Sequence, residues 1–378
     1  MAPASVAAFT DTYLPTVNGV SYTVRTWRDR WAERGGRMDV VYPKSDAYDP
    51  DPGEHPVGSF PFPMYEGFRL GLPTIPDAVA DVDLVHAHTP FAVGLGGVRL
   101  ARRADLPLVT SYHTPTAEYA EYLSSRPRVE HRIQRLADRY ERWFLSRSDA
   151  IVCPSEDTKA RIDRNATVDT PAVVIPNGVD TDFFEPTDAD AFRDRYDLPG
   201  GPLIGYTGRH GYEKNLSEFL RAAAGVEATV VLGGDGPARA DLEDLAADLD
   251  LDARFLGFLP REDLPGFYSA LDAFVFPSPV ETQGLVALEA NACGTPVVAV
   301  DAGALSDTID AGRNGYHYAH GDIAGCRDTI RRVLDERASL SASCLDRREA
   351  VSVDHAVEEL ATLYDRIAAE NASAPGRN

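Results

Sequence analysis

The chain has 378 residues, which is enough for two domains that each bury a core of their own. Its 59 acidic residues outnumber the 37 basic ones and give a net charge of −22, so no overall basic field exists to bind nucleic acid. Lysine stands only at Lys44, Lys159 and Lys214, and such an acidic, lysine-poor composition indicates adaptation to a salty cytoplasm, as in halophilic archaea.

Short apolar runs alternate with amphipathic ones in the first half of the chain, which is typical of strand–helix units in a parallel sheet. We expect irregular structure over 43–76, a stretch rich in Pro, Gly and Asp. The expected helices lie at 20–34, 91–103 and 129–146. The expected strands lie at 6–10, 38–42, 84–88, 108–112, 150–153 and 172–175.

A second series of strands and helices follows the Asp-rich stretch 180–201, which we interpret as a linker. Strands are expected at 203–206, 229–232, 254–256, 273–276 and 297–300, with helices starting near 215, 237, 284 and 323. The sequence therefore predicts an α/β protein with two Rossmann-like domains, 1–180 and 181–352, facing across a cleft. The last helix, within 353–378, is expected to pack back on the first domain. Ligands would bind beyond the carboxyl ends of the strands.

The loop after the first expected strand ends in Gly19, where a helix is expected to start. Glycine lets the backbone approach a ligand closely, and the helix behind it offers the positive end of its dipole. The loop contains no G-x-G-x-x-G string, so NAD binding gains no support. By itself the pattern does not distinguish a ligand site from an ordinary helix start.

Arg209 and Lys214 follow the strand expected at 203–206, in the string Gly-Tyr-Thr-Gly-Arg-His-Gly-Tyr-Glu-Lys-Asn. A guanidinium binds phosphate through two parallel hydrogen bonds, and lysine adds a compact positive charge. Together they would neutralise a departing nucleoside diphosphate without a metal. A solvated turn is the alternative, but one of only three lysines stands here.

Glu281 and Glu289 lie on either side of Gly284, after the strand expected at 273–276. Eight residues of helix rise about 12 Å, whereas the two carboxyls of a retaining glycosidase lie about 5 Å apart. The spacing suits one carboxylate at a sugar and another at a ribose hydroxyl. The N–H groups around Gly284 and Leu285 would form an anion site at a helix N-terminus. The alternative is a helix start with two solvated glutamates.

These strings resemble the family-4 glycosyltransferases of the GT-B type, which have two Rossmann-like domains. The most specific part is the E-x7-E string with its Ala-Cys-Gly-Thr-Pro-Val-Val tail, followed by the G-R-x-x-x-E-K-N string. Further matches lie at 86–91, 176–180 and 233–237. The resemblance implies a retaining hexosyltransferase that needs no bound metal or cofactor. The donor would be a UDP-hexose or GDP-mannose, with base and hexose left open.

In the second domain the resemblance implies that Glu281 lies by the donor sugar and that Glu289 binds the ribose. Arg209 and Lys214 would hold the diphosphate, and Phe258, in a Gly-Phe-Leu-Pro segment, would contact the base.

In the first domain the resemblance implies that Gly19 contacts the diphosphate and that His113 reaches the sugar near the reaction centre. His86 and His88 share a strand face and could ligate a metal, but the sequence offers no third ligand. One departure from the family is Asn291, where Met is usual, and we expect it to change packing only.

Residues 111–147 form a strongly non-acidic tract in which aromatic residues stand among seven arginines. A basic helix with aromatics can lie on an anionic membrane surface, and an ordinary surface helix is the alternative. The string from His113 to Tyr122, with Glu-Thr-Gln-Gly at the donor site, resembles diacylglycerol glucosyltransferases and related glycolipid enzymes. We therefore expect a membrane-lipid acceptor.

The location expected from the sequence is the cytoplasm, with peripheral contact at the inner face of the cell membrane. The four cysteines form no C-x-x-C pair, which indicates a reduced protein. The first residues lack the features of a signal peptide, and no segment approaches the roughly 20 apolar residues of a membrane span.

Three alternative functions stay open. One is a mannosyl- or glucosyltransferase that acts on a polyprenyl-linked or soluble glycan. Another is a sugar-nucleotide 2-epimerase, which shares the two-domain architecture, although the intact E-x7-E string argues against it. The third is a binding protein without activity, which would be expected to have lost Glu281, Arg209 or Lys214.

Overall fold

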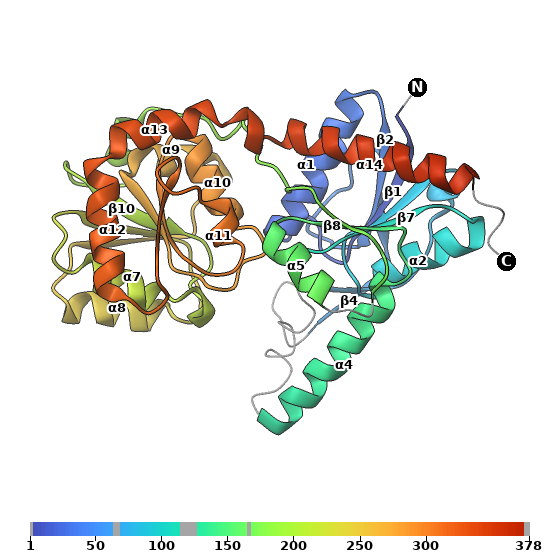
Figure 1. Cartoon of the computed structure of the whole chain (residues 1–378), viewed down its shortest axis with the longest axis horizontal. Coiled ribbons are helices and arrows are strands. Elements are labelled where there is room, and N and C mark those ends of the chain that lie inside the picture. The colour runs from blue at the N-terminus through green and yellow to red at the C-terminus, as the bar shows by residue number, and fades with distance from the viewer. Residues whose placement is uncertain (1–2, 63–68, 114–126, 165–167, 374–378) are drawn as a thin grey trace. The chain divides into compact units, whose positions relative to one another are not determined.

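The computed structural model describes residues 3–62, 69–113, 127–164 and 168–373, with the backbone alone over 127–134 (Figure 1). The chain forms two compact units. The N-terminal unit comprises Met1–Asn177 and Ala356–Asn378, and the C-terminal unit comprises Gly178–His355. Each unit is built on a parallel β-sheet with helices packed against it.

The N-terminal unit holds a seven-stranded parallel sheet in the order β3-β2-β1-β6-β7-β8-β9. Its central strands are apolar runs that are almost wholly buried, as helices on both sides of a sheet require. The strands are β1 (Ser5–Phe9), β2 (Arg37–Pro43), β3 (Glu54–Val57), β6 (Leu84–Ala87), β7 (Leu108–Ser111), β8 (Ala150–Cys153) and β9 (Ala172–Val174). The helices are α1 (Gly19–Glu33), α2 (Ala92–Ala104), α4 (Pro127–Leu145), α5 (Glu156–Arg164) and, from the C-terminus, α14 (Val353–Ser373).

The prediction of irregular structure over 43–76 is wrong in part, at three short strands. The stretch contains β3, which pairs in parallel with β2 at the sheet edge, and the antiparallel pair β4 (Ser59–Pro61) and β5 (Arg69–Gly71). Edge strands are short and tolerate proline, so their composition looks like that of a loop. Burial of Glu54 and Val57 anchors β3 to the unit.

Helix α14 packs along the N-terminal unit, where it lies beside α1 (Figure 1). The ring of Tyr364 meets that of Trp31 on α1 edge to face, with centroids 5.3 Å apart. The Tyr364 hydroxyl also lies 2.6 Å from Nδ1 of His86, at the end of β6. A residue close to the C-terminus thus contacts the middle of the N-terminal sheet.

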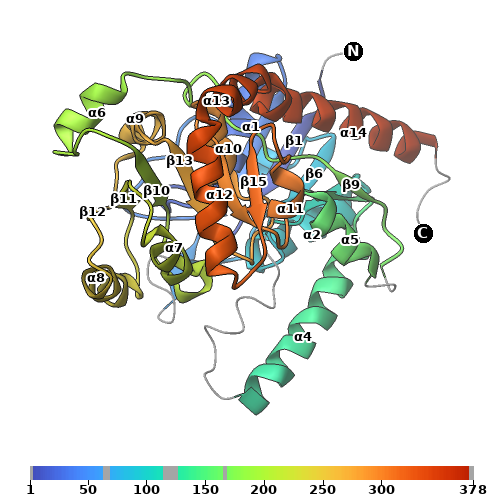
Figure 2. The same cartoon turned by 60° about the vertical axis from the view of Figure 1, so that its left-hand side comes forward.

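The C-terminal unit holds a six-stranded parallel sheet in the order β12-β11-β10-β13-β14-β15. Helix α12 lies across β13, β14 and β15 and packs on α7 (Figure 2). The strands are β10 (Leu203–Thr207), β11 (Thr229–Gly233), β12 (Ala253–Gly257), β13 (Ala273–Phe276), β14 (Val297–Val300) and β15 (Gly315–Tyr318). The helices are α6 (Ala189–Arg195), α7 (Leu216–Ala223), α8 (Arg239–Asp248), α9 (Leu264–Ala270), α10 (Leu285–Ala292), α11 (Leu305–Thr308), α12 (Ile323–Asp335) and α13 (Arg337–Asp346).

Two features of this unit were not predicted. The edge strand β15 is absent from the expected series. The linker interpretation of 180–201 is also wrong, because this stretch forms α6 and buries Phe184 and Phe192 in the core of the C-terminal unit. The two phenylalanines pack in the core of this unit, although the stretch around them is rich in aspartate. In the described part of the chain, no helix is long and apolar enough to cross a membrane.

Asn291 does more than change packing, so that expectation is also wrong. Its side chain is 4% exposed, and its amide nitrogen donates to the carbonyl oxygens of Thr295 (3.0 Å) and Asn314 (3.1 Å). In return, Asn314 Nδ2 donates to Asn291 Oδ1 over 2.9 Å and to the Thr308 carbonyl over 3.1 Å. The two amides hold the β15 loop against α10 through satisfied hydrogen bonds.

Replacing Asn291 with Met, the residue usual in the family, is expected to destabilise the chain by about 1–3 kcal/mol, because the buried Asn314 amide loses its acceptor. Urea unfolding measures this loss. Leu288→Met on the same helix is the matched control, since a volume-conserving apolar exchange costs less than about 1.5 kcal/mol. An Asn291→Met variant as stable as the parent protein would contradict this role of the amide pair.

Candidate functional site

The predicted site residues of the C-terminal unit stand on loops at the carboxyl ends of its strands. Arg209 and Lys214 follow β10, Phe258 follows β12, and Glu281 follows β13. Because β12, β11, β10 and β13 are successive neighbours in one parallel sheet, these loops emerge at the same edge.

An ion pair joins two of these loops. Lys214 Nζ donates to Glu281 Oε1 over 2.6 Å, and the two side chains are only 20% and 15% exposed. Arg209, on the same loop as Lys214, pairs with Glu213 through Nη2. Lysine has three N–H donors, so Lys214 can hold a phosphate oxygen while it keeps its bond to Glu281.

Gly284 starts α10 in a backbone conformation that favours glycine, with φ of 80°. A Cβ atom here would lie 2.6 Å from Cδ2 of Leu305, so the turn has no room for a side chain. The turn is followed by the first N–H groups of α10, which begin at Leu285, four positions along the chain from Glu281. The first N–H groups of an α-helix have no partner within the helix.

Glu289 lies on α10 and accepts a hydrogen bond of 2.6 Å from the Tyr268 hydroxyl. Burial raises the pKa of Glu289, while the bond from Tyr268 opposes that rise. It is therefore not one of two solvated glutamates, and it is separate from the Lys214–Glu281 pair. Phe258 is 69% exposed, an unusual placement for a phenylalanine, which leaves its ring face available to a planar ligand.

In the N-terminal unit, Gly19 is the exposed first residue of α1. Asn18 caps this helix, because its side-chain oxygen accepts from the backbone N–H of Ser21 over 2.9 Å. The Asn18 amide also donates to Thr12 Oγ1 over 2.8 Å, so the loop after β1 is held to the helix start.

His113 follows β7 and is 7% exposed. Its Nε2 lies 3.1 Å from Nδ1 of His88, which follows β6. Burial lowers the pKa of His113 to about 4, against a side-chain hydrogen bond with Asn177 that raises it. The ring is therefore neutral at pH 7.

The structure does not favour the metal interpretation of His86 and His88. Both ring nitrogens of His86 have partners, the Tyr364 hydroxyl at 2.6 Å and Ser111 Oγ at 2.8 Å. No group of three or more His, Cys, Asp or Glu is placed to hold a metal ion within the described residues, 3–62, 69–113, 127–164 and 168–373.

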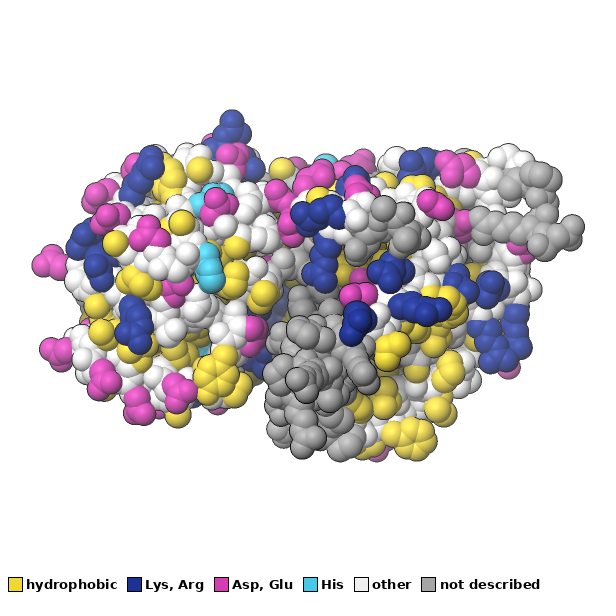
Figure 3. Space-filling view, turned by 60° about the horizontal axis from the view of Figure 1, so that its bottom comes forward, with side chains coloured by type: hydrophobic (Ala, Val, Ile, Leu, Met, Phe, Trp, Pro, Cys, Tyr) yellow, Lys and Arg dark blue, Asp and Glu magenta, His cyan; other side chains and the backbone are white. Residues whose placement is uncertain are grey.

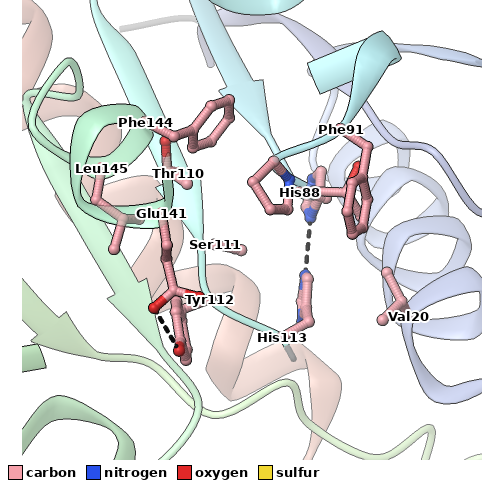
Figure 4. Close-up of a pocket in the computed structure, with 12 residues that line it drawn as sticks. Val20, His88, Phe91, Thr110, Ser111, Tyr112, His113, Glu141, Phe144 and Leu145 are labelled. Carbon is pink, nitrogen blue, oxygen red and sulfur yellow. Dashed lines mark hydrogen bonds between the residues drawn. The ribbon is translucent and has the colours of Figure 1, made fainter. Parts of the chain in front are cut away.

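Figure 4 shows the recess beside His113, with His88 and Phe91 on one side and Tyr112 and Glu141 on the other. The Tyr112 hydroxyl donates to Glu141 Oε1 over 2.9 Å, and this pair joins β7 to α4.

Comparison with known proteins shows to which family the chain belongs. A model of Glycosyltransferase Family 4 matches residues 17–183, and one of Glycosyl transferases group 1 matches residues 188–349. The chain is 32% identical over 304 residues to a 2-deoxystreptamine glucosyltransferase of Streptomyces kanamyceticus, which covers 76% of this chain and 78% of the relative. The chain belongs to glycosyltransferase family 4.

This glycosyltransferase is also 28% identical over 353 residues to an alpha-monoglucosyldiacylglycerol synthase of Streptococcus pneumoniae, across 85% of this chain and 76% of that one. Its fold is similar to that of sucrose-phosphate synthase from Thermosynechococcus elongatus, with a TM-score of 0.77 at 22% identity, over 97% and 100% of the two chains. The predicted GT-B fold class, with two parallel-sheet α/β domains, is thereby confirmed.

Sequence reasoning missed the partners of the predicted site residues in this glycosyltransferase. Tyr268 bonds Glu289 from 21 positions away, and Tyr364 reaches His86 across 278 positions. Asp11 was also missed: it is 2% exposed and accepts from the N–H groups of Val93 (2.8 Å) and Gly94 (3.2 Å) at the start of α2. An acidic residue directly after a buried strand was the available signal.

Proposed function

We propose that this glycosyltransferase moves a hexose from a UDP-hexose or GDP-mannose to a hydroxyl of a membrane lipid, with retention of configuration and without a bound metal. The observation that carries the proposal is the Lys214–Glu281 pair, which brings a half-buried cation and a carboxylate together beside the start of α10. This pairing suits a ligand that has both a phosphate and sugar hydroxyls.

In the proposed reaction, the bond between the anomeric carbon and the diphosphate oxygen breaks, and its electron pair leaves with the nucleoside diphosphate. The acceptor oxygen forms its bond on the same face, and its proton passes to the departing phosphate oxygen. Arg209 and Lys214 would neutralise the charge that develops on the leaving group. Glu281 would bind the sugar hydroxyls, Glu289 the ribose and Phe258 the base.

Binding of the diphosphate would be completed by the N–H groups at Gly284 and Leu285, where the positive end of the α10 dipole favours an anion. Gly19 would add a backbone contact, and its exposure supports this role. His113, neutral at pH 7, would lie near the sugar as an uncharged ring rather than as a cation.

Part of α4 supports the lipid acceptor. Leu136 is 68% exposed and Trp143 is 41% exposed, and together with Arg139 and Tyr140 they line one shallow surface, here called the α4 patch. The guanidinium of Arg147 lies 3.7 Å from the centroid of the Trp143 ring. Figure 3 shows basic side chains beside hydrophobic ones on one face of the N-terminal unit. The tract 111–147 is covered only in part, since 114–126 and the side chains of 127–134 lie outside the described residues.

Arginine next to exposed tryptophan is typical of a surface that binds the headgroup region of an anionic bilayer. The similarity to a diacylglycerol-modifying relative also favours a lipid, whereas the similarity to a 2-deoxystreptamine glucosyltransferase favours a soluble acceptor. Because the composition is strongly acidic, we expect membrane binding and catalysis to persist at high KCl.

A liposome experiment tests the proposed binding of the α4 patch to an anionic membrane. The protein is expected to sediment with vesicles of anionic lipid in molar KCl, and the Leu136→Ser/Trp143→Ser variant is expected to lose most of this binding, because apolar burial resists salt screening. Phe60→Ser is the matched control, since Phe60 is also exposed (62%) but lies on β4, outside the α4 patch.

A product assay tests the acceptor itself. We expect sugar to be transferred from one donor to a polar lipid extract, giving a glycolipid. Transfer to a soluble glycan or aminocyclitol with none to lipid would overturn the lipid acceptor. If the wild-type protein does not sediment with anionic vesicles, peripheral binding through the α4 patch is overturned.

A further inference from the structure

Three histidines form a buried stack at the carboxyl ends of β6 and β7. His86, His88 and His113 are 0%, 1% and 7% exposed. The His86 and His88 rings are stacked with centroids 4.1 Å apart, and the His88 and His113 rings with centroids 5.4 Å apart. Trp27 lies against all three rings, with centroid distances of 5.7 to 6.3 Å. The three rings are thus packed against one another and against Trp27.

The ends of this stack are held by hydrogen bonds. Both nitrogens of His86 have partners, and His113 contacts His88 and Asn177. His88 differs, because its Nε2 is buried and has no hydrogen-bond partner among the residues that the structure describes. His88 also lines the recess shown in Figure 4.

The hydrogen bond between His88 and His113 restricts their protonation. Burial keeps both rings neutral at pH 7, so each carries a single N–H. One ring must donate across the 3.1 Å contact and the other must accept. If His113 donated, the proton of His88 would lie on Nε2, which has no partner among the described residues, and an unpaired buried N–H is rarer than an unpaired acceptor. The favoured arrangement has His88 donating through Nδ1.

We propose that His88, rather than His113, presents the ligand-facing imidazole nitrogen of this stack, and that its Nε2 accepts a hydrogen bond from a hydroxyl of the sugar or acceptor that enters the recess. His86, Tyr364 and His113 hold the His88 ring in place. The inference rests on the proposed function, since it assigns a hydroxyl-bearing substrate to the N-terminal unit. It makes His88 a further substrate-binding residue.

Two substitutions separate this role from simple packing. The amide of asparagine falls near the position of Nδ1 and can still donate to His113, but it leaves nothing at Nε2. Glutamine is longer, so its amide reaches the position of Nε2 and can accept a hydroxyl there. His88→Asn is expected to lower kcat/KM for transfer to the polar lipid extract by about 10- to 100-fold, the effect of losing one buried hydrogen bond. His88→Gln is expected to retain several-fold more activity than His88→Asn.

The control readout is binding of UDP and GDP by calorimetry, which both variants should keep within a few-fold of the wild type. Equal activity of His88→Asn and wild type, or a His88→Gln variant no better than His88→Asn, would overturn the assignment. If wild-type protein shows no transfer at all, the proposed function fails instead.

A second measurement does not depend on activity. In a long-range ¹H–¹⁵N spectrum of histidine-labelled protein at pH 7, the signals lost in His88→Asn identify His88. They are expected to show a protonated Nδ1 and a bare Nε2. A protonated Nε2 would overturn the proposal, because that nitrogen could not then accept a hydroxyl proton.

Discussion

Lys214→Ala is expected to lower kcat for sugar transfer by about 10²- to 10³-fold, the usual loss when one preorganised group that stabilises developing charge is removed. Lys214 is 20% exposed and its Nζ lies 2.6 Å from Glu281, so the charge is held in place and only partly screened by water. Initial rates of nucleoside diphosphate release, with donor and acceptor both saturating, measure the effect.

The chain supplies a matched control for this prediction. Lys159 is one of the two other lysines, and it pairs with Asp163 on the exposed face of α5. Lys159→Ala should leave kcat unchanged. Equal rates in Lys214→Ala and Lys159→Ala would show that Lys214 does not act on the leaving group.

Part of the Lys214→Ala effect belongs to Glu281, which loses its cation. Glu281→Gln and the double variant Lys214→Ala/Glu281→Gln separate the two contributions. If the pair acts as one unit, the double variant should be hardly slower than the slower single variant.

Glu54→Ala is expected to destabilise the chain by about 3–5 kcal/mol, the cost of leaving a buried partner charge uncompensated. The Glu54 side chain is 0% exposed and binds the guanidinium of Arg28. Its carboxylate also accepts from the hydroxyls of Tyr13 (2.8 Å) and Tyr48 (3.0 Å) and from the N–H of Asp51 (2.9 Å). Removing it takes this acceptor from Nη1 of Arg28 and from three further donors, while Arg28 keeps its bond to the Pro52 carbonyl.

This cluster also positions the candidate site, because Tyr13 belongs to the loop that leads from β1 to Gly19. Urea unfolding measures the loss, and Glu33→Ala is the control. Glu33 pairs with Arg30 on the surface and its side chain is 62% exposed, so its removal should cost less than about 1 kcal/mol. A loss below 1 kcal/mol in Glu54→Ala would contradict the role of this carboxylate in holding the loop.

The sequence predicted the central strands well because they are continuous apolar runs. The strands expected at 273–276 and 297–300 have these bounds in the structure. It did not predict β3 and β15, which lie at sheet edges where pairing on one side is enough and polar residues are tolerated. The aromatic anchors Phe184 and Phe192 were hidden in an Asp-rich stretch whose composition is that of a linker.

The candidate site was also predicted only in part. Glu281 and Lys214 were selected separately from their positions after strands, and the structure joins them across 67 positions. Their contact follows from β10 and β13 being neighbours, and strand order cannot be read from local pattern. Sequence reasoning could not find the His88 Nε2 either, which has no hydrogen-bond partner in the described part of the chain, because its surroundings depend on how β6, β7 and α14 come together.

The proposed function is tested most directly by measuring what becomes of the nucleotide-sugar donor. UDP-glucose, UDP-galactose, UDP-GlcNAc and GDP-mannose are each incubated with the protein and a polar lipid extract at high KCl, with EDTA present. We predict that one donor is consumed, that nucleoside diphosphate and glycoside appear in equal amounts, and that the new linkage keeps the anomeric configuration of the donor. Conversion of the donor to an epimer without a glycoside, or no consumption of any donor, would contradict the account.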